Sequence, residues 1–161
     1  MKGASVFILI AAAILLAACS STGASVSVVD AWARPAEAGS NSAAYFQLFN
    51  NSDAADALLS AEATVARAVE IHETMAVEID DEMDGMVDSA NENGMEMEAM
   101  VMVPQERVDL AAGETVIFQP GGLHVMMIDL NQALAVGDMF DLTLNFESGL
   151  IIQLEVEVKQ P

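Results

Sequence analysis

The sequence predicts an all-β fold, an antiparallel β-sandwich. Short segments rich in β-branched and aromatic residues recur along the chain, and each is bounded by Gly, Pro or Asn. The last of them, residues 154–158, alternates strictly between apolar and acidic side chains, as in a strand with one buried face. No long stretch has helical periodicity. Many short strands at close spacing are typical of two packed antiparallel sheets.

The expected strands begin with residues 26–34, where apolar and polar residues alternate, and 44–49, which a turn-prone Asn-Asn-Ser-Asp run follows. Residues 54–73 are ambiguous, because their Ala, Leu and Glu content favours helix while their β-branched residues fall at odd spacing. We expect strands there. Four later strands are clearer: residues 115–119, 124–130, 140–146 and 150–158.

Composition limits the function. The chain has 161 residues, enough for one domain, and a hydrophobic fraction of 53% that excludes a wholly disordered protein. A net charge of -20 with five basic residues argues against nucleic-acid binding and against a basic membrane-surface patch. With a single Cys there is no intramolecular disulfide and no Cys-rich metal site, so a metal site has to use His, Met or carboxylate.

The N-terminus predicts export and lipid anchoring. Lys2 precedes an apolar run, residues 6–16, that is shorter than the roughly 20 residues of a membrane span. The Leu-Ala-Ala-Cys that ends at Cys19 resembles the bacterial lipoprotein signal, in which the Cys is lipidated; the alternative is a plain secretory signal with an incidental Cys. We expect attachment to the envelope by the lipid anchor only, in the periplasm, with Ser20 favouring an outer membrane where one exists. The expected parts are a signal peptide (1–18), a lipidated Cys and linker (19–25) and one sandwich domain (26–161).

An acidic segment interrupts the strand pattern. Residues 73–98 contain ten acidic residues, no basic ones and five Met, so we expect a solvated loop that forms no packed strand. A metal-attracting arm is the alternative. Residues 80–85 resemble the start of an EF-hand loop, but its twelfth position is Asn91, where calcium needs a bidentate Glu.

The two histidines, His72 and His124, each lie near methionine. Methionine commonly fills gaps in a core, and both histidines could be structural. On a strand, however, residues two apart share a face, so His124 and Met126 can converge on one ion. A Pro-Gly-Gly turn, residues 120–122, places this strand end at the rim of the sandwich, where a site can open to a partner.

Met102 is followed by twenty-one residues and then by His124, Val125 and Met126. This spacing resembles the second half of the signature of the periplasmic copper(I) chaperone family PCu(A)C. Other stretches resemble the same family: residues 31–35, 43–46, 100–104, 110–115 and 118–126. The resemblance therefore covers nearly the whole chain after Cys19.

The first half of the signature departs from the family. His72 matches its first His, but Met102 lies thirty positions later rather than eleven. We interpret the difference as an insertion at about residues 78–98, which bulges from a hairpin whose two ends still meet. Met102 is the expected ligand because its spacing to His124 is intact. The lesser candidates are Met75, Met97 and Met100.

The resemblance implies a cupredoxin-like sandwich that binds one Cu(I) through His72, Met102, His124 and Met126. It further implies delivery to the copper centre of a terminal oxidase, with a cytochrome oxidase subunit or a Sco-type copper relay protein as the acceptor. The residue types agree, because thioethers and imidazoles suit monovalent copper. A blue-copper electron-transfer site needs a Cys thiolate, and the only Cys is the expected lipid anchor.

Other functions stay open at this point. The Met-bearing acidic insertion could serve copper sequestration or tolerance, in which case several ions would bind. A calcium-dependent envelope module would need residues 80–92 to become ordered by calcium. We expect no enzymatic activity, because the sequence contains no catalytic thiol, nucleotide-binding glycine loop or supported Ser-His-Asp arrangement.

Overall fold

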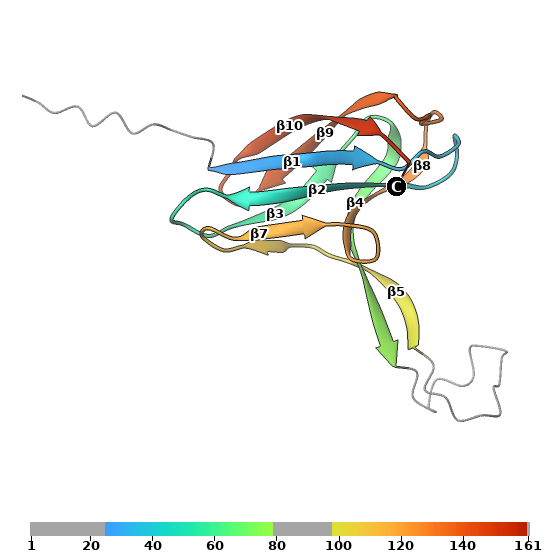
Figure 1. Cartoon of the computed structure of the whole chain (residues 1–161). Helices are drawn as coiled ribbons and strands as arrows, with labels where there is room; N and C mark the ends of the chain where they lie inside the picture. Colours follow the sequence, from blue (N-terminus) through green and yellow to red (C-terminus); the bar gives the residue numbers. More distant parts are fainter. Residues whose placement is uncertain (1–24, 79–97, 161) are drawn as a thin grey trace, which may run out of the picture.

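The computed structural model describes residues 25–78 and 98–160, and every regular element in these ranges is a strand (Figure 1). The predicted all-β class is confirmed. Within the described residues, no helix has the length and hydropathy to cross a bilayer. The ten strands are β1 (Val26–Ala33), β2 (Ser42–Asn50), β3 (Asp56–Glu62), β4 (Ala66–Glu78), β5 (Glu98–Pro104), β6 (Val108–Leu110), β7 (Thr115–Phe118), β8 (Leu123–Leu130), β9 (Met139–Phe146) and β10 (Ile151–Val158).

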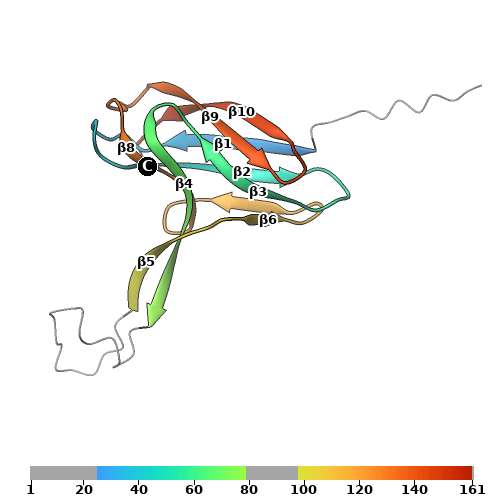
Figure 2. The same cartoon turned by 180° about the vertical axis from the view of Figure 1, so that it is seen from behind.

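The strands form one hydrogen-bonded sheet in the order β5-β4-β8-β7-β2-β1-β10-β9-β3-β6, and β8 also pairs with β2. Seen from opposite sides in Figures 1 and 2, the sheet curls so that its two halves enclose one core. Most neighbours are antiparallel, as predicted. The exceptions are β1 and β10, which pair in parallel, and β7 and β8, which pair in parallel at Phe118 and Leu123.

The core is built by alternation along the strands. In β9, Phe140, Leu142, Leu144 and Phe146 are buried while the residues between them are not. The other half of the sheet contributes fully buried side chains such as Leu48 to the same cluster. Such alternation buries one face of each strand, so the opposite faces of β2, β4 and β8 remain available for other uses.

A bulge in β1 explains why the alternation of buried and exposed residues shifts by one position along this strand. Asp30 has a φ of 55°, and the pairing of β1 with β2 shifts register between Val29 and Trp32. The extra residue moves later side chains to the other face, so Val26 is buried before the bulge and Ala33 after it. As a result Trp32 lies opposite Tyr45, with ring centroids 4.6 Å apart.

Most of residues 54–73 form strands, as predicted: β3 takes up residues 56–62, and β4 begins at Ala66 after a short turn. The expectation that residues 73–98 form no packed strand is wrong at its start, because β4 continues to Glu78. There it pairs with β5 in a hairpin that projects from the sandwich, with Glu78 opposite Glu98 (Figure 1). A hairpin ladder satisfies the backbone without burying both faces, so acidic side chains do not prevent it. The predicted hairpin with meeting ends is therefore present.

Several predictions of the sequence lie outside the described residues. These are the signal peptide, the Cys19 anchor and its linker up to residue 24, the EF-hand-like stretch 80–91, and Met97.

Asn50 links the end of β2 to neighbouring segments through side-chain hydrogen bonds. We predict that Asn50→Ala lowers the free energy of unfolding by about 2–4 kcal/mol. This fully buried side chain donates from Nδ2 to the carbonyls of Ala54, Leu110 and Ala111, at 2.8–3.1 Å, and accepts from Ser52 at Oδ1. Removing it leaves those carbonyls without their donor. Urea denaturation measures the loss.

The control is Asn131→Ala, which removes one exposed hydrogen bond, from Nδ2 of Asn131 to the carbonyl of Thr64. It is expected to cost less than about 1 kcal/mol. Equal losses in the two variants would contradict the role assigned to Asn50.

Candidate metal centre

The two histidines lie side by side on neighbouring strands. His72 on β4 is directly opposite His124 on β8, and their ring centroids are 5.8 Å apart. Residues opposite one another in an antiparallel pair share a face of the sheet. Met126 is two residues beyond His124 and lies opposite Glu70. Alternation along each strand therefore places all four side chains on one face.

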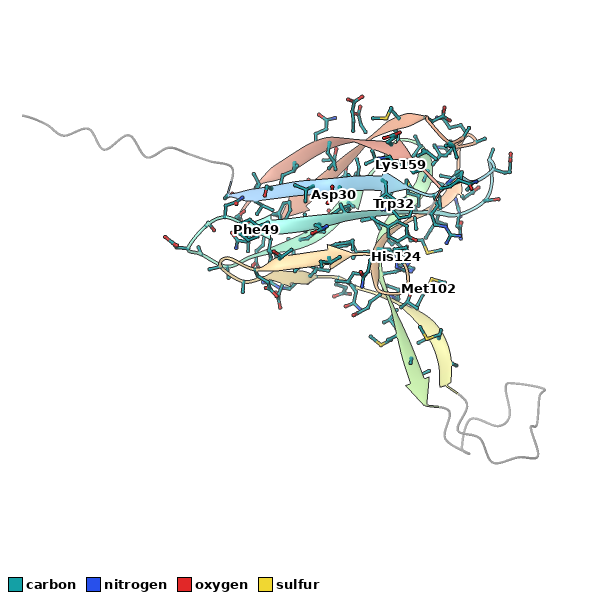
Figure 3. All side chains as sticks on the ribbon, in the orientation of Figure 1. Asp30, Trp32, Phe49, Met102, His124 and Lys159 are labelled. Atoms are coloured by element: carbon teal, nitrogen blue, oxygen red, sulfur yellow. The ribbon has the colours of Figure 1, made fainter. Side chains whose placement is uncertain are left out.

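Met102 joins this face from the other side of β4. It lies on β5 opposite Thr74, which is two residues after His72 on the same strand. The order β5-β4-β8 makes β4 the middle strand, so Met102 and His124 flank it. The four predicted ligands thus come from three adjacent strands and share one face. Figure 3 shows Met102 and His124 together where the β4–β5 hairpin leaves the sandwich.

A pocket of about 310 Å³ opens on this face. Three of the four predicted ligands, Met102, His124 and Met126, line it. His72 does not line it and lies beside it against the His124 ring. The remaining lining residues are Arg34, Pro35, Asn41, Ser42, Ala43, Tyr45, Thr74, Pro120 and Gly121. The structure therefore brings three predicted ligands to one pocket and places the fourth behind the lining residue His124.

Burial differs sharply between the two histidines and Met102. His72 and His124 are 8% and 6% exposed, whereas Met102 is 58% exposed. The histidines are held by the surrounding sheet, and the thioether of Met102 reaches solvent. An ion bound between them would be fixed on one side and accessible to an incoming ligand on the other.

His124 keeps one nitrogen for binding. Its Nδ1–H donates to the carbonyl of Gly122, at 2.9 Å. That carbonyl is held in the predicted turn, where Gly121 adopts a φ of +79°, a conformation that favours glycine. A carbonyl only accepts, so neutral His124 carries its proton on Nδ1 and keeps the lone pair of Nε2.

His72 has the opposite arrangement. Its Nε2–H donates to the carboxylate of Glu70, at 2.8 Å. Its Nδ1 is buried and has no hydrogen-bond partner in the described part of the chain. A buried polar atom without a partner is costly and calls for an explanation. A lone pair reserved for a metal ion supplies one, since Nδ1 of neutral His72 is its unprotonated nitrogen.

The donor set is two imidazole nitrogens and two thioethers. Among the described residues no three His, Cys, Asp or Glu side chains gather as a metal site. The site therefore lacks the oxygen ligands that Mg²⁺ and Ca²⁺ require, and it lacks the thiolates of structural zinc sites. Neutral soft sulfur with imidazole suits monovalent copper.

The lesser candidate ligands are placed less favourably. Met100 shares the face of Met102 but lies opposite Ala76, one step further from the histidines, and is 63% exposed. Met75 lies opposite Val101, so it points to the other face of β4.

Sequence reasoning missed two features of the pocket. Arg34, for which the sequence predicts no role at the site, lines the pocket. Tyr45 packs near the His124 ring, with centroids 6.5 Å apart. Arg34 did carry a signal, because it is one of only five basic residues in a strongly acidic chain.

We predict that the two histidines adopt opposite tautomers in the metal-free protein. Neutral His124 should carry its proton on Nδ1, and neutral His72 on Nε2, because the groups they bond, a carbonyl and a carboxylate, both accept. Long-range ¹H–¹⁵N NMR correlations, recorded at a pH where both rings are neutral, distinguish the tautomers. The same tautomer in both rings would contradict this assignment of free nitrogens.

Comparison with known proteins gives a family. The sequence profile of the family described as "Putative lipoprotein LpqE-like" matches residues 26–158. The protein described as "Putative lipoprotein Lxx21020", of Leifsonia xyli subsp. xyli, is 26% identical over 134 residues, which cover 83% of this chain and 69% of that protein. Both matches describe lipoproteins.

Solved structures give the fold. The apo PCuAC domain of PmoF1 superposes with a TM-score of 0.61 and 22% identity, over 85% of this chain and 95% of that one. The copper-bound PCuAC domain of PmoF2 has a TM-score of 0.60 and 20% identity, over 85% and 94%. Cu(I)-bound DR1885 of Deinococcus radiodurans has a TM-score of 0.50 and 27% identity, over 82% and 78%. The predicted cupredoxin-like fold and the family resemblance are confirmed, and the chain belongs to the LpqE-like family of lipoproteins.

Proposed function

We propose that this protein is an extracytoplasmic copper carrier that binds one Cu(I) through His72, Met102, His124 and Met126. The observation that carries the proposal is the register of three adjacent strands. It gathers three of these side chains at one pocket and places the fourth, His72, against the ring of His124. The copper-bound PmoF2 domain and Cu(I)-bound DR1885 support the choice of metal. A lipid at Cys19 would tether the carrier to the envelope, in the periplasm.

The exposure of the ligands favours carriage over storage or electron transfer. Blue-copper electron-transfer sites use a Cys thiolate, and the only cysteine of the sequence, Cys19, is the proposed lipid anchor. Because Met102 is largely exposed, an acceptor can approach the ion and replace this ligand first. The proposed acceptor is the copper centre of a terminal oxidase, reached through an oxidase subunit or a Sco-type relay protein.

We predict one tightly bound Cu(I) per chain. Replacing any proposed ligand by Ala should weaken Cu(I) binding by roughly tenfold or more, because losing even a residue that hydrogen-bonds to a metal ligand has an effect of this size. The four variants are His72→Ala, Met102→Ala, His124→Ala and Met126→Ala. Anaerobic competition against a chromophoric Cu(I) chelator measures both the stoichiometry and the affinity.

Met75→Ala is the matched control, because Met75 lies on β4 but on the opposite face. It should bind Cu(I) as the unchanged protein does. Wild-type affinity in both His124→Ala and Met126→Ala would overturn the site. Several bound ions, with affinity lost on deleting residues 78–98, would instead support sequestration by the acidic insertion.

Delivery is a separate prediction. The copper-loaded protein should transfer its ion to the apo form of the soluble copper domain of an oxidase subunit, because exposed thioethers exchange readily for the ligands of an acceptor. Absorbance of the filled oxidase centre, under conditions that allow its oxidation, follows the transfer. Bovine serum albumin in place of the acceptor domain controls for passive loss. Retention of copper in the presence of both an oxidase domain and a Sco-type protein would contradict delivery.

A further inference from the structure

Arg34 stands out because basic side chains are scarce and otherwise neutralised. The chain has five Lys and Arg against 25 Asp and Glu. Within residues 25–78 and 98–160, three of the four basic side chains form ion pairs: Arg67 with Asp129, Arg107 with Asp109 and Glu147, and Lys159 with Glu157. Arg34 forms none in that part of the chain.

The backbone around Arg34 is held firmly at the pocket. Its N–H donates to the carbonyl of Ala43, at 3.0 Å, and its own carbonyl accepts from the hydroxyl of Ser42, at 2.6 Å. The preceding carbonyl, of Ala33, accepts from the N–H of Lys159, at 2.9 Å. The exposed Arg34 side chain lines the same pocket as Met102, His124 and Met126. The fold thus holds the backbone of this cationic residue in place beside the proposed copper site.

This cation does not serve to hold the metal. A guanidinium stays protonated and is no ligand for copper. Two neutral imidazoles and two thioethers around Cu(I) carry one positive charge, which a neighbouring Arg repels rather than stabilises. What a guanidinium recognises is a carboxylate or a similar planar anion, through two parallel hydrogen bonds.

We propose that Arg34 binds an anionic group, a carboxylate, that the copper acceptor carries beside its own copper ligands. This inference rests on the proposed copper-carrier function. The net charge of -20 repels an acidic partner over most of the surface, so one exposed cation at the pocket selects where an anion can approach. The pairing orients the acceptor so that its ligands reach the ion on the side where Met102 is exposed.

The test compares Cu(I) transfer to two chelators. One is 2,9-dimethyl-1,10-phenanthroline, which is neutral, and the other is its disulfonated 4,7-diphenyl derivative, which is anionic. Stopped-flow absorbance gives a rate constant for each, and the measured quantity is the ratio of the anionic to the neutral rate constant at low ionic strength. Because both constants include release from the same site, the ratio cancels a change in copper affinity.

Arg34→Gln should lower this ratio by roughly three- to tenfold, the scale expected for one steering charge. Arg67→Gln loses the same charge at a side chain that pairs with Asp129 and does not line the pocket, so its ratio should match that of the unchanged protein. Arg34→Lys keeps the charge and should retain the ratio within about twofold, since the ratio measures attraction by the charge and a Lys ammonium attracts an oxyanion as a point charge.

An Arg34→Gln ratio equal to that of Arg67→Gln would overturn the inference, and so would an Arg34→Lys ratio as low as that of Arg34→Gln. Failure of the copper-carrier function itself appears earlier and separately. In that case the unchanged protein retains no Cu(I) before either chelator is added.

Discussion

The pairing of His72 with His124 across β4 and β8 is the constraint on which the site depends. A shift of register by one residue would send the side chains of one strand to the other face and separate the ligands. The core prevents such a shift. On the reverse face of the same strands, Ile71 lies opposite Val125, and both are buried. The alternation that builds the core thus also fixes the positions of the metal ligands.

The site combines fixed and accessible ligands. Each histidine commits one nitrogen to a nearby acceptor, Glu70 or the carbonyl of Gly122, and keeps the other. These bonds set the ring orientations before an ion arrives, which reduces the entropy lost on binding. Met102 lies on the projecting hairpin and is mostly exposed. A site that is rigid on one side and open on the other suits an ion that has to be both held and handed over.

On this face of the sheet, neutral side chains are the proposed metal ligands, and charged side chains affect which partners approach. The proposed copper ligands are neutral side chains, so selectivity comes from the softness of sulfur and nitrogen rather than from attraction to carboxylates. Acidic residues dominate the rest of the chain and limit which partners approach. Arg34 is the exception at the pocket, and its backbone is anchored by Ser42 and Ala43 on the neighbouring strand.

Local pattern was enough to predict the all-β class, most of the strands, and the likeness to PCu(A)C carried by Met102, His124 and Met126, because alternation and spacing are local properties. The continuation of β4 through acidic residues to Glu78 was not predictable in this way, since it depends on pairing with β5. The bulge at Asp30 and the parallel β1–β10 pair likewise arise from contacts between distant segments.

The sequence by itself determined which donor atoms the protein has: two histidines, eleven methionines and a single cysteine. Only the tertiary structure decided which nitrogen of each histidine is free, which methionines share a face with them, and that Arg34 lies at the same pocket. The physical reason is that hydrogen-bond partners and shared faces are set by strand register, and register depends on which strands pair across the sheet.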